Sequence, residues 1–194
     1  MLTKKMTPFE EIFTSMKIKL KDKYSNLHMI PKLSKVVVSM CINEATRNNK
    51  IVDSLKPYLE MIIGQRTCYT YAKTSNSNFH LREGMKLGLK GTLRGFNMYT
   101  FLEKTIYYTL SKNNNFKGLT EKNLDGNGNL NIGIDDLRYF LELPRNKFDN
   151  EFGFKNKYGL NISIHTTATN NNDALILLNE YNFPFINKKT RGNL

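Results

Sequence analysis

The alternation of apolar and polar positions is clearest over residues 85–94. Apolar side chains occupy every second position, at Met85, Leu87, Leu89 and Leu93. Polar and basic side chains stand between them, at Lys86, Lys90, Thr92 and Arg94. Successive side chains of a strand point to opposite faces of its sheet, so the segment predicts a strand with one apolar and one basic face. Its two glycines favour a bulge or the close approach of another backbone.

Three further segments have the character of strands. Residues 33–43 contain three consecutive valines, residues 67–73 are rich in β-branched and aromatic side chains, and residues 160–167 alternate apolar with polar positions. Residues 74–84, between the second of these segments and the strand at 85–94, are polar and predict a loop.

Helical spacing of apolar side chains marks four segments, at 7–23, 48–63, 97–112 and 172–181. The first begins with Thr7, Pro8 and Glu10, a combination typical of helix starts. In the second, Pro57 is expected to kink or weaken the helix, and Gly64 is placed to end it.

Residues 113–158 are rich in Asn, Gly and Lys. They predict long loops with short strands near 130–134 and 138–143, and loops of this length are often functional. Within them, residues 125–129 resemble the start of a calcium loop, but the sixth position is Leu130 rather than Gly and the twelfth is Asp136 rather than Glu. A turn is the favoured interpretation.

Taken together, the elements predict an α+β fold formed by one domain over residues 1–194. Its single, largely antiparallel sheet is expected to carry helices on one face and to leave the other face polar and basic. A polar sheet face can be merely solvated. The spacing of Lys86, Lys90 and Arg94 along one strand favours a ligand with repeating negative charge.

The net charge of the chain indicates which class of partner the protein binds. There are 29 basic and 17 acidic residues, which give a formal net charge of +12. Such an excess indicates a polyanionic partner, either nucleic acid or an anionic membrane surface. The basic residues are spread along the chain, which favours a folded surface with many phosphate contacts over a basic tail. No apolar run is long enough to predict a membrane span.

Candidate chemistry is sparse. The cysteines Cys41 and Cys68 lack metal-binding spacing, and both fall in predicted strands, where buried free thiols in a reducing compartment are expected. The three histidines lie far apart in sequence, and no phosphate-binding glycine motif occurs. No catalytic constellation is visible, so we expect neither an enzyme nor a cofactor nor a metal site.

Several stretches resemble one family in order and spacing, from about residue 5 to residue 188. They are M-I-P-K-L-S-K-V-V-V-S-M at 29–40, I-I-G-Q-R at 62–66, L-R-E-G-M-K-L-G at 81–88, T-L-R-G at 92–95, F-K-G-L-T at 116–120, L-D-G-N-G-N at 124–129, I-S-I-H-T-T-A at 162–168 and F-P-F at 183–185. The ordered set is similar to the large-subunit ribosomal protein family numbered five, whose members bind 5S ribosomal RNA in bacteria and organelles.

The resemblance implies a function for the polar sheet face. In the family this face docks on 5S ribosomal RNA in the central protuberance of the large subunit, among neighbouring ribosomal proteins. The corresponding residues here are Ser39, Gln65, Thr92 and Arg94, with Lys90 and Lys86 nearby.

The family also extends a loop toward the peptidyl-site transfer RNA. Here that loop is residues 73–84, and its candidate contacts are Lys73, Thr74, Ser75, Asn76, Ser77, Asn78, His80 and Arg82. The family's loop is typically rich in Lys and Arg, whereas this one has few basic residues.

Two departures point to an organelle. Ser39 stands where the family usually has Asn, and residues 41–43 stand where it has Gly-x-Gly. The chain also contains 25 Asn and 22 Lys but only four Ala, which is typical of an AT-rich genome. Both features favour the mitochondrial ribosome, with a plastid or a bacterial cytoplasm as alternatives. The changed segment leaves a second function open, a ribosomal protein that has lost 5S RNA and docks on large-subunit RNA and neighbouring proteins.

Overall fold

The computed structural model describes residues 24, 26–154 and 156–186. The helix predicted at 7–23 lies outside these residues. No helix in the described part of the chain is both long and apolar enough to cross a membrane.

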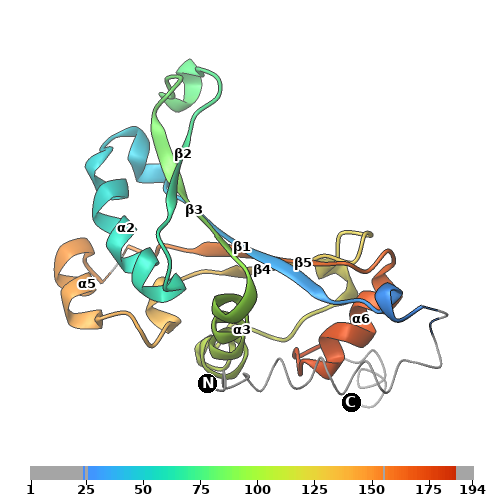
Figure 1. Cartoon of the computed structure of the whole chain (residues 1–194). Coiled ribbons are helices and arrows are strands. Elements are labelled where there is room, and N and C mark those ends of the chain that lie inside the picture. Colours follow the sequence, from blue (N-terminus) through green and yellow to red (C-terminus); the bar gives the residue numbers. More distant parts are fainter. Residues whose placement is uncertain (1–23, 25, 155, 187–194) are drawn as a thin grey trace, which may run out of the picture. The chain divides into compact units, whose positions relative to one another are not determined.

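Among the described residues, five strands form one sheet (Figure 1). They are β1 (Leu33–Cys41), β2 (Cys68–Tyr71), β3 (Lys86–Leu93), β4 (Leu130–Ile134) and β5 (Leu160–Thr166). The strand order is β2-β3-β1-β5-β4, and β3 pairs antiparallel with both β1 and β2. The strands at 33–43, 67–73, 85–94, 130–134 and 160–167 are confirmed, each within a few residues of its predicted ends, and the fold class is α+β as predicted.

The longer helices are α2 (Lys50–Ile63), α3 (Gly95–Lys104), α5 (Arg145–Phe152) and α6 (Asn171–Glu180). A π-helical segment (Thr105–Thr109) joins α3 to the short α4 (Leu110–Lys112). Short 3-10 turns lie at Leu27–Met29, Asn43–Thr46, Ser77–Phe79, Glu121–Asn123 and Leu137–Tyr139. The helices predicted at 48–63, 97–112 and 172–181 are confirmed.

Two residues in or directly after α2 were singled out from the sequence, and the structure tests the prediction for one of them, Gly64. Gly64 ends the helix in the left-handed conformation, with φ 71°, as predicted. Pro57 lies inside α2 and does not end it. The helix persists across this residue because its apolar stripe, which includes Leu55 and Leu59, is fully buried.

The strand predicted at 138–143 is wrong. Residues 137–139 form a 3-10 turn instead, and the side chain of Asp136 accepts a hydrogen bond from the backbone N–H of Arg138 at 3.0 Å. An acceptor at this position stabilises the start of a turn and competes with strand geometry. The helix α5 that follows was not predicted.

The described chain falls into two compact units. The hairpin unit comprises residues 36–93 and 132–162, and the terminal unit comprises the described residues of 1–35, 94–131 and 163–194. The core of the hairpin unit contains Val36, Val38 and Met40 of β1, Leu89 and Leu93 of β3, and Val52, Leu55, Leu59, Ile62 and Ile63 of α2. The core of the terminal unit contains Met98, Phe101, Leu102, Ile106, Leu110, Leu119, Ala174, Leu177, Leu178 and Tyr181.

The β2–β3 hairpin extends beyond α2 in the hairpin unit (Figure 1). Gly88 of β3 lies in the sheet where a Cβ atom would collide with the carbonyl oxygen of Met40 on β1. This glycine therefore permits the close approach of the two backbones, as the sequence suggested. The next residue toward the hairpin tip, Leu87, lies at an irregularity in the pairing of β2 with β3.

The turn at 125–129 lies in the terminal unit and is held by one side chain. The Oδ1 atom of Asp125 accepts hydrogen bonds from the backbone N–H groups of Asn127 at 2.9 Å and Asn129 at 3.0 Å. The side-chain amide of Asn129 donates to Oδ2 at 2.7 Å, and this bond holds the pKa of Asp125 below its ordinary value. The carboxylate is thus engaged by the turn itself.

Candidate RNA-binding surface

The pairing register defines which side chains share the sheet face opposite α2. Lys90 of β3 lies between Ser39 of β1 and Cys68 of β2, and Gly88 lies between Cys41 of β1 and Thr70 of β2. Paired residues of antiparallel strands have their Cα atoms about 5 Å apart, so these side chains form one small surface. We call it the open face of the hairpin unit.

The apolar side of the same strands faces α2. Leu89 and Leu93 are fully buried, whereas Lys90 is exposed and Thr92 half-buried. A Cβ atom on Gly91 would lie 3.1 Å from a side-chain carbon of Ile63, at the end of α2. The predicted division of residues 88–93 into an apolar and a polar face is therefore confirmed.

The division fails at Lys86. Tyr71 pairs with Lys86 whereas Thr70 pairs with Gly88, so Leu87 is an extra residue that shifts the register by one. The shift turns Lys86 to the side of α2, where its Nζ atom lies 2.9 Å from Oδ1 of Asp53. The prediction that Lys86 shares a face with Lys90 is wrong.

The ring of Tyr69 lies next to this ion pair. The Nζ atoms of Lys86 and Lys56 each lie 4.4 Å from the centre of its ring, a cation–π distance. The hydrogen bond from Lys86 holds the pKa of Asp53 below its ordinary value, and the same bond raises the pKa of Lys86. Lys86 is therefore already engaged by protein groups.

Lys90 is in the opposite situation. Its ammonium has no hydrogen-bond or ion-pair partner among the described residues, and its side chain is exposed. Gln65, which follows α2, donates its side-chain amide to the carbonyl oxygen of Thr92 at 3.1 Å. Four of the predicted contacts, Ser39, Gln65, Lys90 and Thr92, are thus brought together in the hairpin unit.

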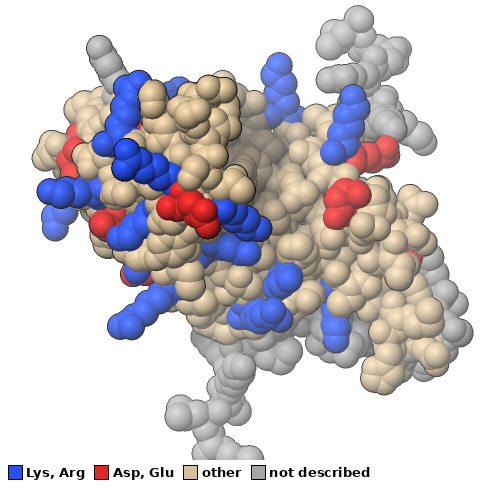
Figure 2. Space-filling model, turned by 90° about the horizontal axis from the view of Figure 1, so that it is seen from above, with Lys and Arg blue, Asp and Glu red and all other residues tan. Residues whose placement is uncertain are grey.

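Arg94 belongs to the terminal unit and immediately precedes α3. It is exposed, has an extended backbone, and makes no side-chain capping bond to the helix. Its guanidinium is available for a ligand, because within the described chain no partner engages it. Figure 2 shows basic side chains predominating over acidic ones on the side seen from above.

Both cysteines lie on the open face. The expectation of buried thiols is wrong, since Cys41 and Cys68 are exposed and free. The reason is the pairing register. Cys41 is two residues from Ser39 and so lies on the same face of the sheet, opposite the buried Met40, and Cys68 is paired with Lys90 on that face. Two strand spacings of about 4.8 Å separate the strands that carry them, which is too far for a disulfide.

The loop at 73–84 is exposed along almost its whole length. Its backbone is nevertheless held by local hydrogen bonds. The Oδ1 atom of Asn76 accepts from the backbone N–H of Asn78 at 3.0 Å, and the Oγ atom of Ser75 accepts from the backbone N–H of Glu83 at 3.0 Å. His80 adopts the left-handed conformation, with φ 54°, and turns the chain so that Leu81 forms a bridge with Asn76. The predicted polar loop therefore contains a compact turn.

Comparison with known proteins identifies the family. A sequence model described as "Ribosomal protein L5" matches residues 26–82, and a second model, which describes the C-terminus of the same ribosomal family, matches residues 86–185. The chain belongs to the ribosomal protein L5 family. Members of this family are structural constituents of the large ribosomal subunit, and rRNA binding is typical of them.

Bacterial relatives match over most of their length. The large ribosomal subunit protein uL5 of Ehrlichia canis is 42% identical over 176 residues, which cover 91% of this chain and 95% of the relative. The uL5 protein of Thermosipho africanus is 40% identical over 84% of this chain and 86% of its own length. The uL5 protein of Corynebacterium kroppenstedtii is 38% identical over 84% of this chain and 85% of its own length. The chain is therefore a structural ribosomal protein and not an enzyme.

Sequence reasoning missed several residues of the open face. Cys41, Cys68 and Thr70 were not among the predicted contacts, although the structure places them beside Lys90 and Gly88. The alternation of residues 68–71 carried the signal, but using it required the register with β3. The exposed aromatic ring of Phe79, at the tip of the hairpin, was also missed.

Proposed function

We propose that the open face of the hairpin unit binds 5S ribosomal RNA in the central protuberance of the large subunit. The observation that carries this proposal is the exposed ammonium of Lys90, which lies between Ser39 and Cys68 and has no partner in the described part of the chain. An ammonium without a partner among the described residues can contact a phosphate without first breaking an ion pair within the protein. Ser39, Gln65 and Thr92 supply hydrogen-bonding groups around it.

Arg94 contributes a second phosphate contact from the terminal unit. Arg94→Glu is expected to weaken RNA binding and leave the domain folded, because the side chain has no partner in the described chain and an acidic residue before α3 favours the helix dipole. Filter binding and a melting curve on the same preparations test this. Unchanged binding with a native melting curve would remove Arg94 from the surface.

Lys86 has a smaller part in this proposal than the resemblance implied. Its ammonium is bonded to Asp53 on the side of α2, so it adds little net charge at the open face. We propose that it acts mainly by fixing β3 on α2, and that direct RNA contacts fall to Lys90.

We further propose that the loop at 73–84 contacts the peptidyl-site transfer RNA through Lys73, Thr74, Ser75, Asn76, Ser77, Asn78, His80 and Arg82. The loop is exposed and projects at the end of the hairpin, which supports such a contact (Figure 1). With only Lys73 and Arg82 as cations in it, hydrogen bonds carry more of the contact than charge.

The proposed location is the mitochondrial ribosome. The excess of Asn and Lys over Ala supports a gene in an AT-rich genome, and the departures at Ser39 and residues 41–43 support a diverged ribosome.

A second function has one observation in its favour. The side chain of Cys41 is exposed on the open face, where the family has glycine, and it limits how closely RNA can approach the backbone. In this alternative the protein has lost 5S RNA, and its open face contacts large-subunit RNA or a neighbouring protein.

Sucrose-gradient sedimentation of a mitochondrial lysate separates the two. The main proposal expects the chain in the large-subunit fraction and a 5S-type RNA released with it at high salt, since phosphate contacts weaken steeply with salt. The chain in that fraction without any 5S-type RNA supports the alternative. Absence of the chain from mitochondrial ribosomes contradicts the location.

A further inference from the structure

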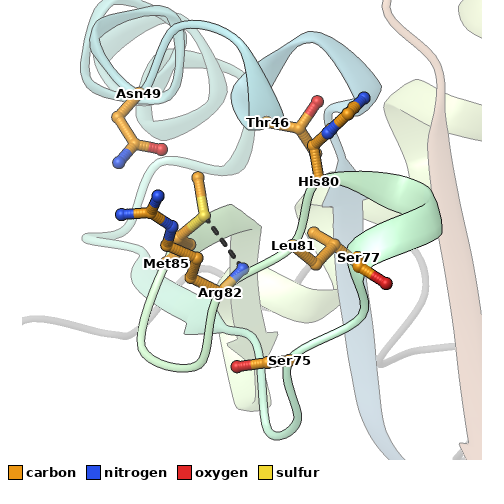
Figure 3. A pocket seen from close by; sticks show the side chains of 8 residues that line it. All are labelled: Thr46, Asn49, Ser75, Ser77, His80, Leu81, Arg82 and Met85. Atoms are coloured by element: carbon orange, nitrogen blue, oxygen red, sulfur yellow. Dashed lines mark hydrogen bonds between the residues drawn. The ribbon is translucent and has the colours of Figure 1, made fainter.

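A hollow of about 750 Å³ lies within the hairpin unit, between the loop of the β2–β3 hairpin and the start of α2 (Figure 3). Eight residues line it: Thr46, Asn49, Ser75, Ser77, His80, Leu81, Arg82 and Met85. Its size is in the range of pockets that hold small organic groups. No carboxylate is among the lining residues.

Some polar groups of the pocket are used to build it. The hydroxyl of Thr46 donates to the carbonyl oxygen of Asn43 at 3.1 Å, and Ser75 Oγ accepts from the N–H of Glu83. The sulfur of Met85 accepts from the N–H of Arg82 at 3.2 Å (Figure 3). These bonds fix the walls.

Other groups are unengaged. The guanidinium of Arg82, the imidazole of His80 and the amide of Asn49 have no hydrogen-bond or ion-pair partner within the part of the chain that the structure describes. Figure 3 shows Arg82 and Asn49 on the same side of the hollow and His80 beside Thr46. Donors that stay unpaired around an opening are available to a ligand.

The charge of the pocket favours an anionic group. Arg82 supplies a guanidinium, whose planar set of donors fits phosphate oxygens. Asn49, which precedes the 14-residue helix α2, adds an uncharged side-chain donor to the same hollow. Both features favour a phosphate.

The apolar part of the pocket favours a flat ring. Leu81 and Met85 line it, and aliphatic and thioether side chains pack on the face of an aromatic ring. Phe79 stands beside the lining residues with 67% of its surface exposed, which suits stacking on a neighbouring base. A phosphate beside a flat ring with polar edges is the chemistry of a nucleotide.

We propose that this pocket receives a single unstacked nucleotide of a structured RNA, with its phosphate on Arg82, its base edge on Asn49 and an adjacent base on Phe79. The proposal rests on the proposed RNA-binding function: the pocket is separate from the open face, and it gives part of the loop at 73–84, already proposed to contact transfer RNA, a defined nucleotide site. An unstacked base is read by hydrogen bonds and stacking, so the contact needs few basic residues.

Fluorescence anisotropy tests it with two labelled RNA hairpins, one fully paired and one with a single bulged adenosine. The full chain is expected to bind the bulged hairpin about tenfold more tightly, a gain within the range that one stacked base contributes. Arg82→Gln and Asn49→Ala are each expected to reduce this ratio to within about twofold of one. Asn49→Ala changes no charge, and its side chain caps no helix N–H.

Arg145→Gln is the matched control. Arg145 is exposed in the same unit at the start of α5, so it loses the same charge outside the pocket and should keep the tenfold ratio. Equal binding of the two hairpins by the unmodified chain overturns the pocket and leaves the open face standing. Loss of the ratio in Arg145→Gln assigns it to net charge and also overturns the pocket. Failure to bind either hairpin also overturns the pocket, whereas failure to bind 5S-type RNA in the same assay contradicts the proposed function.

Discussion

Two arginines of the hairpin unit are used in opposite ways. Arg138 is largely buried, with 17% of its side chain exposed, and its guanidinium donates to Asp149 at 2.7 Å, to Asp136 at 2.9 Å, and to the carbonyl oxygens of Asn156 and Gly153. Arg82 is exposed, and no described residue engages its guanidinium. Arg82 stands in the loop predicted at 74–84, whereas Arg138 begins the stretch at 138–143 for which a strand was predicted.

The surroundings of Arg138 explain why it is engaged. Its guanidinium lies 5.4 Å from the ring centre of Phe148, and that ring packs edge-on against Tyr58 and Tyr158. In such a place the donors of a guanidinium must all find acceptors, because an unpaired buried charge is very costly. An arginine therefore indicates a ligand site only where its donors remain unpaired.

Removing each guanidinium should separate the two roles most clearly. Arg138→Met is expected to lower the free energy of unfolding by about 3–5 kcal/mol, because Asp136 and Asp149 would be left as uncompensated, largely buried charges. Arg82→Met, the matched exposed change, should stay within about 0.5 kcal/mol. Chemical denaturation measures both. Equal losses would contradict the division between structural and binding arginines.

Lys90 extends the comparison to the open face. Lys90→Glu is expected to weaken binding to 5S-type RNA about tenfold or more, because it removes one phosphate contact and adds repulsion; the salt slope should fall by about 0.9. Lys147→Glu reverses the same charge at an exposed position of α5 and should cost about threefold at most. Titration at several salt concentrations measures both. Similar losses would mean that net charge alone binds RNA.

Lys86 is the intermediate case, since it is a surface lysine with a partner. Asp53→Asn is expected to strengthen RNA binding about twofold to threefold at neutral pH, because it removes an acidic group and releases an ammonium. The titration used for Lys90 measures this change, and weaker binding would contradict it.

The pH dependence of the Lys86–Asp53 pair has a defined sign. The pKa of Asp53 is depressed in the folded chain, so the pair's stabilisation is present above the ordinary carboxyl pKa and is lost as pH falls through the depressed value. Thermal melts of the native chain and Asp53→Asn should differ at neutral pH and converge in acid. A constant difference across this range would remove Asp53 as the titrating group.

Much of the fold follows from periodicity. The two-residue period of β3 and β5 and the helical stripe of α2 fix which side chains are buried, and the structure confirms them at Leu89, Leu93, Ile162 and Leu55. Helix α5 could not be found in this way, because only Phe148 and Phe152 of its eight residues are buried. Its stability comes from packing on Tyr58, a residue distant in sequence.

The candidate site was predictable only where local pattern and register agree. Ser39, Lys90 and Thr92 could be placed on one face from alternation alone, and the structure places them there. Lys86 could not be placed, because a bulge changes the parity of every residue beyond it. The glycines of this strand favoured either a bulge or a close backbone approach and did not fix where the parity changes. The exposure of Cys41 and Cys68 likewise depends on which face α2 covers.

Leu87, the extra residue in β3, also determines which one-codon deletions the strand can tolerate. Gly88 pairs with Thr70, and Lys86 pairs with Tyr71. Loss of the codon for Leu87 would therefore keep both pairs, and each neighbouring side chain would stay on the same face of the sheet. Loss of any codon between 88 and 93 would instead invert one part of the strand and turn apolar side chains toward the solvent. Leu87 is thus the position in β3 where a one-codon deletion preserves the pattern of the sheet.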